Sequence, residues 1–120
     1  MHELSIATAV VNTACKHADG RPVSVVSMRV GRLRQVVPAS LRFYFEIVAR
    51  DTVCEGAVLD LTEIDLVLRC AHCNCGWSPD LPVFRCPECG GADVAIESGE
   101  ELEVDYIEVS EREAQCIGPR

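Results

Sequence analysis

The sequence predicts an α+β protein: a small mixed α/β domain, with two helices on a three-stranded sheet, that carries an inserted zinc-ribbon-like module of four cysteines. Three observations lead to this prediction. Two segments have apolar residues at helical spacing, three segments are typical of strands, and two C-x-x-C pairs lie between the last two strands. With 120 residues, the chain has the size of one domain with a small appendage.

The composition is that of a soluble globular protein, with 48% hydrophobic and 25% charged residues. Aromatic residues make up only 5%, so we expect a core of valine, leucine, isoleucine and alanine. No apolar run reaches the length of a membrane span, and no signal peptide precedes the first helix, so we expect a cytoplasmic protein. The net charge of −8 argues against a general attraction to nucleic acid phosphates.

The first predicted element is a helix whose apolar residues recur at intervals of three and four positions. These residues are Leu4, Ala7, Val11, Ala14 and Ala18. Gly20 suits a helix end and Pro22 cannot continue a helix, so the helix is expected to stop between Ala18 and Pro22. The β-branched segment 23–30 then predicts the first strand.

A second helix is predicted to begin at Pro38, where the fixed φ and the missing N–H of proline do no harm. Its buried stripe would consist of Leu41, Tyr44, Phe45 and Val48. Segments 57–68 and 101–109 predict the second and third strands. The simplest arrangement pairs these two strands as antiparallel neighbours, with the cysteine module projecting from one end of the pair.

The segment between those two strands differs from the rest of the chain in composition. It contains five of the eight cysteines and little apolar patterning. We therefore expect a discontinuous α/β domain formed by residues 1–68 and 96–120, and a separate metal-binding module at residues 69–95.

The cysteine module has two properly spaced ligand pairs. Cys70 and Cys73 form the first C-x-x-C pair, and Cys86 and Cys89 form the second. Each pair can place two thiolates on one ion, and a tetrahedral four-sulfur site is typical of zinc. Gly90 permits the tight turn after the last ligand. Four thiolates leave no open coordination position, so the predicted zinc site is structural and does not activate water.

Some of the metal assignment stays open at the level of sequence. Cys75 lies two residues after Cys73 and is an alternative second ligand, although the regular spacing favours Cys73. Iron can occupy four thiolates as it does in rubredoxin-like sites, and zinc is preferred because nothing else indicates electron transfer. We interpret His72 as an exposed loop histidine. Cys15 and Cys54 are expected to be packed small hydrophobes, and Cys116 a thiol of the C-terminal segment.

The first three residues can form a second metal site of a different kind. Met1 offers its α-amine, and His2 offers its backbone nitrogen and its imidazole Nδ1, which together close a five- and a six-membered chelate ring. Such a planar nitrogen field suits Ni(II) or Cu(II). Glu3 adds a carboxylate or its backbone nitrogen as a fourth donor. The alternative is that His2 has no role and that Glu3 only favours the start of the helix through the helix dipole.

The order of these elements resembles the HypA family of [NiFe]-hydrogenase maturation proteins. The resemblance rests on "MHELSIATAVV", "VGRLRQVVPASLRFYFEIV", the two cysteine pairs and "GEELEVDYIEVS", and it covers essentially the whole chain. It implies that the α/β domain binds nickel through Met1, His2 and Glu3. It also implies a separate zinc domain with the four cysteines named above, nickel delivery to hydrogenase, and the GTPase HypB as a partner.

The sequence therefore predicts a nickel metallochaperone and not an enzyme. It contains no Ser/His/Asp set and no phosphate-binding glycine loop, so nucleotide hydrolysis would have to come from a partner. The expected partners are HypB and the precursor of the hydrogenase large subunit; a homodimer and a role in urease maturation are left open. The alternatives are a zinc-ribbon module that binds nucleic acid or protein, and a rubredoxin-like electron carrier.

Overall fold

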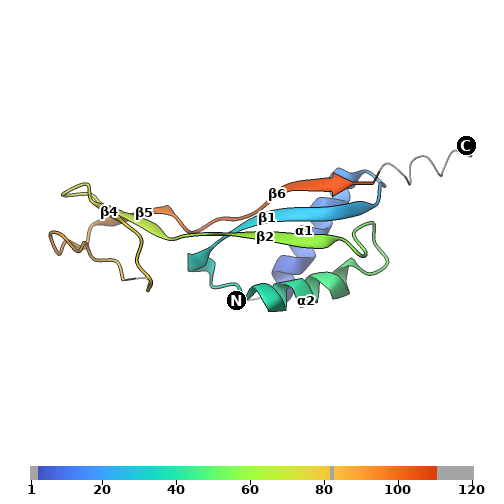
Figure 1. Ribbon diagram of the computed structural model, residues 1–120, viewed down its shortest axis with the longest axis horizontal. Coiled ribbons are helices and arrows are strands. Elements are labelled where there is room, and N and C mark those ends of the chain that lie inside the picture. The colour runs from blue at the N-terminus through green and yellow to red at the C-terminus, as the bar shows by residue number, and fades with distance from the viewer. Residues whose placement is uncertain (1–2, 82, 111–120) are drawn as a thin grey trace, which may run out of the picture. The chain divides into compact units, whose positions relative to one another are not determined.

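The computed structural model describes residues 3–81 and 83–110. Its elements, in chain order, are α1 (Glu3–Ala18), β1 (Val23–Gly31), a short 3-10 helix η1 (Arg32–Arg34), α2 (Pro38–Ala49), β2 (Val58–Ile64), β3 (Val67–Cys70), β4 (Gly76–Trp77), β5 (Val94–Ser98) and β6 (Leu102–Val109) (Figure 1). The predicted α+β class, with two helices, a three-stranded sheet and a four-cysteine module, is confirmed.

The chain divides into two compact units, each built from discontinuous segments. The α/β unit comprises Met1–Arg29, Val36–Thr62 and Glu103–Arg120. The cysteine unit comprises Val30–Gln35 and Glu63–Leu102. The module boundaries predicted from composition, at residues 69 and 95, lie inside the cysteine unit. This unit also takes in a short segment from the end of β1.

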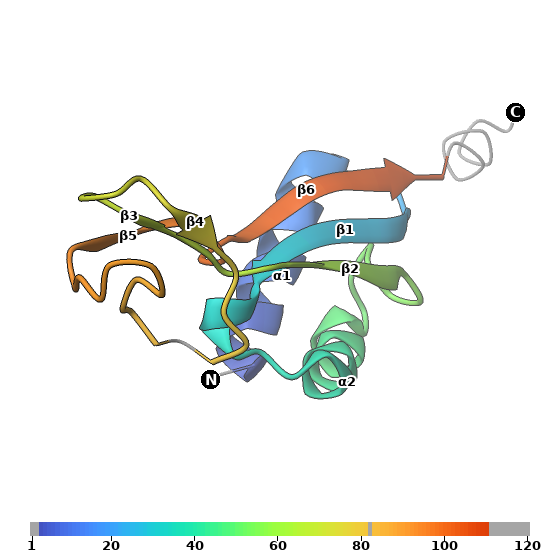
Figure 2. The same cartoon turned by 60° about the vertical axis from the view of Figure 1, so that its left-hand side comes forward.

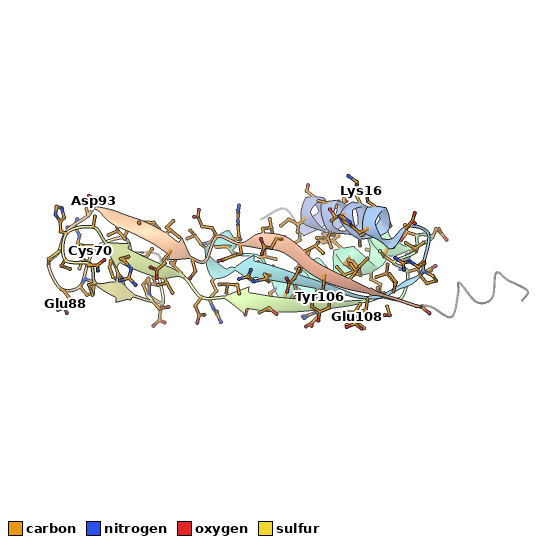
Figure 3. The ribbon with its side chains drawn as sticks, turned by 90° about the horizontal axis from the view of Figure 1, so that it is seen from above. Lys16, Cys70, Glu88, Asp93, Tyr106 and Glu108 are labelled. Carbon is orange, nitrogen blue, oxygen red and sulfur yellow. The ribbon has the colours of Figure 1, made fainter. Side chains whose placement is uncertain are left out.

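In the α/β unit, both helices lie on the same side of the sheet, as Figure 3 shows. Helices α1 and α2 pack against each other and against the sheet through small and medium apolar side chains. The buried members of this core include Ala7, Ala14, Met28, Leu41 and Phe45. As predicted, α1 ends at Ala18 and α2 begins at Pro38.

The order of the strands in this sheet is β2-β1-β6, so β1 lies in the centre. The predicted pairing of segments 57–68 and 101–109 as direct neighbours is wrong in this sheet, because β1 separates β2 from β6 (Figure 2). The physical reason is the burial of β1. Consecutive residues Val26, Ser27 and Met28 are all buried, which is typical of a central strand with a neighbouring strand on each edge.

The predicted strand at 57–68 is in fact divided between the two sheets. Its first part is β2, and its last residues belong to β3 in a second sheet of order β4-β3-β5. Strand β3 pairs antiparallel with β5, with Cys70 opposite Val94, and with β4, with Leu68 opposite Trp77. Leu68 is fully buried in this small sheet.

Two glycines allow a close approach of backbones within the cysteine unit. Gly31 donates its N–H to the carbonyl oxygen of Glu101, and Leu33 donates to the carbonyl oxygen of Gly99. A Cβ added to Gly31 would lie only 2.0 Å from the carbonyl group of Gly99, so any larger residue at position 31 would push the end of β1 away from the connection between β5 and β6. Within the described residues, no helix is both long and apolar enough to span a bilayer.

Candidate metal centre

Four cysteines converge at the tip of the cysteine unit. Their sulfur atoms, on Cys70, Cys73, Cys86 and Cys89, all lie within 4.8 Å of one another. The Sγ atoms of Cys70 and Cys89 are 3.6 Å apart, and those of Cys73 and Cys86 are 3.4 Å apart. In a tetrahedron with zinc–sulfur bonds of about 2.3 Å, neighbouring sulfurs lie about 3.8 Å apart. The four-cysteine site is therefore compatible with structural zinc.

The two C-x-x-C segments adopt the same backbone turn. In the first, the N–H of Asn74 donates to the carbonyl of Cys70; in the second, Gly90 donates to Cys86 in the same way. Asn74 and Gly90, which follow the second cysteine of each pair, both have left-handed backbones, with φ of 61° and 73°. Asparagine and glycine are the residues that tolerate this conformation best. The turn that the sequence predicted at Gly90 is confirmed.

This repeated geometry shows that Cys73 and Cys75 have different structural roles. Cys75 takes the position that Gly91 takes in the second turn: the carbonyl oxygens of Cys75 and Gly91 accept the N–H groups of Cys70 and Cys86, respectively. The Cys75 thiol faces the carbonyl of Gly76 at 3.9 Å and is not part of the four-sulfur cluster. His72 is exposed and also lies outside the cluster.

Backbone N–H groups prepare two of the four sulfurs to carry negative charge. The pKa of the Cys70 thiol is lowered, chiefly because the N–H of Cys73 donates to its sulfur. Burial acts to raise the pKa of Cys86, but the N–H groups of Cys89 and Glu88 outweigh it and lower that pKa to about 6. N–H donation to a thiolate is a recurring means of stabilising it for metal binding.

The other two sulfurs hold their protons more tightly. The N–H of Cys75 acts to lower the pKa of Cys73, but the neighbouring Cys86 sulfur and burial raise it to about 12. The pKa of Cys89 is also raised; the N–H of Gly91 opposes this shift, and the sulfurs of Cys70 and Cys86 produce it. A divalent cation bound by the four sulfurs would displace the protons that they still hold.

Sequence reasoning missed the support of the second turn by Arg85. Its guanidinium donates to the carbonyl of Gly90 at 2.9 Å and so holds the loop that carries Cys86 and Cys89. No spacing rule predicts this contact, because it depends on an arginine side chain folding back across five residues. On β3 and β5, Arg69 and Glu97 form a 2.7 Å ion pair on the sheet that presents Cys70.

Of the residues predicted to hold nickel, the structure describes only Glu3; Met1 and His2 lie outside the described residues. Glu3 is the first residue of α1, and its carboxylate Oε2 accepts the N–H of Val37 at 3.1 Å. Val37 is the N-cap of α2. The Glu3 side chain therefore connects the first turn of α1 with the start of α2.

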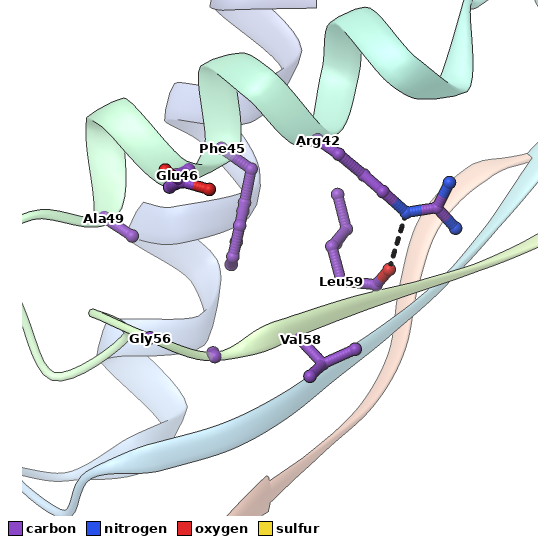
Figure 4. Close-up of a pocket in the computed structure, with 8 residues that line it drawn as sticks. Arg42, Phe45, Glu46, Ala49, Gly56, Val58 and Leu59 are labelled. Atoms are coloured by element: carbon purple, nitrogen blue, oxygen red, sulfur yellow. Dashed lines mark hydrogen bonds between the residues drawn. The ribbon is translucent and has the colours of Figure 1, made fainter.

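A separate pocket of about 310 Å³ opens between α2 and the start of β2 (Figure 4). Phe45 and Leu59 line it, and Arg42 closes one side by donating from its Nε to the carbonyl of Leu59 at 3.2 Å. Arg42 and Glu46 are its only charged lining residues among those described, and neither a nucleophile nor a metal-ligand set accompanies them. The pocket offers no catalytic arrangement.

Comparison with known proteins identifies the family. The family model described as "Hydrogenase/urease nickel incorporation, metallochaperone, hypA" matches residues 1–109. The chain belongs to the HypA family. It is 39% identical over 109 residues to the hydrogenase maturation factor HypA of Geotalea uraniireducens, covering 91% of this chain and 99% of that protein. It is 44% identical to the HypA of Streptomyces avermitilis, covering 87% and 83% of the two chains.

The HypA fold is also that of solved structures. The solution structure of the Ni metallochaperone HypA from Helicobacter pylori superposes with a TM-score of 0.66 at 23% identity, covering 91% of this chain and 97% of that one. HypA proteins are nickel-incorporation metallochaperones and not enzymes. This agrees with a chain whose best-formed site is a closed set of four sulfurs.

Proposed function

We propose that this HypA-family chain binds Ni(II) at its N-terminus and delivers it during the maturation of [NiFe]-hydrogenase. The observation that carries the proposal is the Met1-His2-Glu3 sequence in a chain that the HypA family model matches from residue 1. The α-amine of Met1, with the backbone nitrogen and imidazole of His2, provides three nitrogen donors in one plane. Ni(II) favours such a tetragonal nitrogen field.

Glu3 provides the fourth donor in this proposal, either through its carboxylate or through its backbone nitrogen. The carboxylate Oε2 accepts the N–H of Val37 at 3.1 Å, so nickel binding through the carboxylate would compete with this contact. Binding through the backbone nitrogen would complete a square of four nitrogen donors and would leave the carboxylate in contact with Val37.

We propose that Cys70, Cys73, Cys86 and Cys89 hold one structural Zn(II). Support comes from the four sulfurs within 4.8 Å and from the equivalent turns that present them. Four thiolates leave no coordination position for a substrate, so the role of this zinc ion would be to stabilise the cysteine unit.

Delivery requires partners that supply energy and receive nickel. We propose that the chain acts in the cytoplasm with the GTPase HypB and the precursor of the hydrogenase large subunit. The sequence has no phosphate-binding loop of its own, so a nucleotide-driven step belongs to a partner. A short chelate at the chain end suits transfer, because an acceptor can approach it from outside the fold. The family description also names urease as a destination for nickel.

The nickel site is tested by titrating Ni(II) into untagged protein and into protein extended by two residues at the N-terminus, at equal zinc content. The extension converts the α-amine into an amide and breaks the first chelate ring. His2→Ala breaks the second. We expect both changes to weaken nickel binding at least tenfold without changing zinc content or the far-ultraviolet spectrum. Equal nickel affinity in untagged and extended protein would overturn the N-terminal chelate.

The matched control is His17→Ala, which removes a histidine from the last turn of the same helix. His17 has no place in the chelate, so nickel affinity should not change in this variant. Nickel binding should also fall with decreasing pH, because Ni(II) competes with protons for the amine, the imidazole and the backbone nitrogens.

A further inference from the structure

Two cysteines outside the four-sulfur cluster lie side by side in the α/β unit. The Sγ atoms of Cys15 and Cys54 are 3.8 Å apart, although the residues are 39 positions apart in the sequence. Cys15 is partly exposed, and Cys54 is fully buried. The sequence predicted both as packed small hydrophobes; their pairing depends on the fold and has no local signal.

Both thiols are held in place by ordered backbone. Cys15 lies in the last turn of α1. Cys54 lies in the connection between α2 and β2, which is fixed at both ends: the N–H of Thr52 donates to Ala49, and the N–H of Ala57 donates to Cys54. The N–H of Cys54 itself donates to the hydroxyl of Thr52 at 3.0 Å. The closeness of the two sulfurs is therefore a property of the folded unit.

We propose that Cys15 and Cys54 are a redox modification site that closes to a reversible disulfide when the protein meets an oxidised low-molecular-weight disulfide. To form a disulfide bond, the two Sγ atoms must approach each other by about 1.7 Å. A small rotation of each side chain about its Cα–Cβ bond can supply this movement. In a reducing compartment such a bond is transient, so the pair serves as a responsive site and not as a permanent crosslink.

The exchange proceeds in two balanced steps. In the first, the Cys15 thiolate attacks one sulfur of the external disulfide, forms a mixed disulfide and releases one small thiolate, which takes up a proton. In the second, the Cys54 sulfur loses its proton to solvent and attacks the Cys15 sulfur, and the second small thiolate leaves and takes up a proton. The two cysteines lose two electrons and two protons, and the external disulfide becomes two thiols.

The order of attack follows from exposure and charge. Burial, together with the neighbouring Cys15 sulfur, raises the pKa of the Cys54 thiol to about 12. Cys54 is therefore the resolving sulfur. Once Cys15 is in a mixed disulfide it carries no negative charge, so this part of the barrier to deprotonating Cys54 disappears.

The disulfide would connect the end of α1 to the segment after α2, and the loop that it closes contains all of β1 and α2. Closing a loop of this length constrains the unfolded chain. We expect oxidation to raise the thermal midpoint of the α/β unit by roughly 5–15 °C. Nickel affinity should stay the same, because Cys15 lies at the opposite end of α1 from Glu3.

The test is made on full-length, zinc-loaded protein carrying Cys116→Ser, so that fewer thiols compete. The protein is treated with oxidised glutathione and digested without reduction, and the peptides are mapped by mass spectrometry. Zinc released during the treatment is measured with a colorimetric chelator. We expect a peptide pair linked through Cys15 and Cys54, formed at full zinc retention and removed by dithiothreitol together with the gain in thermal midpoint.

Cys15→Ser is the main variant, because its side chain is partly exposed and the fold should tolerate the change. It should abolish both the link and the gain in thermal midpoint. The matched control Cys75→Ser removes a thiol outside both groups and should leave the link intact. A stable glutathione adduct on Cys15 with Cys54 still reduced would overturn the proposal. A link that forms only in denaturant, or only after zinc release, would overturn it equally.

Discussion

The α/β unit and the cysteine unit differ in how much apolar surface they bury. The buried apolar side chains of the described residues lie mostly in the α/β unit, on α1, β1 and α2. In the cysteine unit this set is limited to Val30, Leu66, Leu68 and two of the cysteines, Cys70 and Cys86. Two of the five buried side chains are thus themselves candidate metal ligands.

This difference indicates different sources of stability. In a core of valine, leucine and methionine, each large side chain that is fully buried contributes about 1.5–3 kcal/mol to the free energy of folding. The cysteine unit has too few such side chains to fold by burial alone, and large apolar residues in its loop, Leu81 and Val83, remain exposed. A bound metal ion can supply the missing free energy, as it does in other small metal-binding modules.

Loss of zinc should produce the largest difference between the two units. In Cys86→Ala, or after strong chelation, we expect zinc release and loss of amide protection across residues 63–102, while α1, β1 and α2 stay protected. The measurement is hydrogen exchange followed by mass spectrometry, with zinc content determined in parallel. Retention of zinc and of protection at β3 and β5 would contradict a metal-dependent unit.

Cys75→Ser is the matched control for that experiment. It also removes one thiol from the same segment, but Cys75 lies outside the four-sulfur cluster. Zinc content, sulfur coordination by X-ray absorption, and nickel affinity should match those of the unmodified protein. A changed sulfur coordination would show instead that Cys75 exchanges with Cys73.

Truncation of the apolar core should produce the reverse pattern. Leu41 is fully buried on α2, so Leu41→Ala should lower the free energy of unfolding of the α/β unit by about 3 kcal/mol. Zinc affinity should not change, because the four sulfurs belong to the other unit. Denaturant titration checks the first expectation, and competition with a zinc chelator checks the second. Similar losses in Leu41→Ala and Ala39→Gly, an exposed site on the same helix, would indicate a general effect on α2.

Substitution of Glu3 should have a smaller effect on stability, confined to the α/β unit. Glu3→Ala removes the acceptor of the Val37 N–H and should cost about 1 kcal/mol of stability. If the backbone nitrogen of Glu3 is the nickel donor, nickel affinity should change far less than in His2→Ala. A loss of nickel affinity equal to that of His2→Ala would assign the carboxylate to nickel.

Loss of the Arg69–Glu97 ion pair should have the smallest effect on stability, because both side chains are exposed. The Arg69 guanidinium lowers the pKa of Glu97, so the pair stabilises the folded state above the unfolded pKa, near 4.5, and this contribution is lost as pH falls through the folded pKa. At pH 7, Glu97→Gln should slightly increase hydrogen exchange on β3 and β5. The difference should shrink in high salt; a difference that persists would point to lost packing.

Local features of the sequence predicted the parts of the molecule that are determined locally. The end of α1 near Gly20, the start of α2 at Pro38 and the turn at Gly90 each follow from the backbone preference of one or two residues. The C-x-x-C spacing likewise predicted which four cysteines the structure brings together. The assignment of these cysteines to zinc, and of residues 1–3 to nickel, stays a prediction.

Features that depend on distant contacts were not predictable. The central place of β1 depends on its pairing with a strand on each edge, and its β-branched sequence alone does not distinguish a central strand from an edge strand. The break between β2 and β3 falls at residues 65–66, inside a segment that is apolar enough to read as one strand. The approach of Cys15 to Cys54 requires α1 and the segment after α2 to be placed first.

The close approach of Gly31 and Gly99 has a consequence for protein engineering. The cysteine unit is not one continuous stretch, because it also includes Val30–Gln35, and Gly31 and Leu33 of this stretch bond to Glu101 and Gly99. A graft of residues 63–102 alone into another protein would leave those backbone partners behind. A transplantable version must therefore carry both pieces of chain, joined by a new linker, and must keep glycine at position 31.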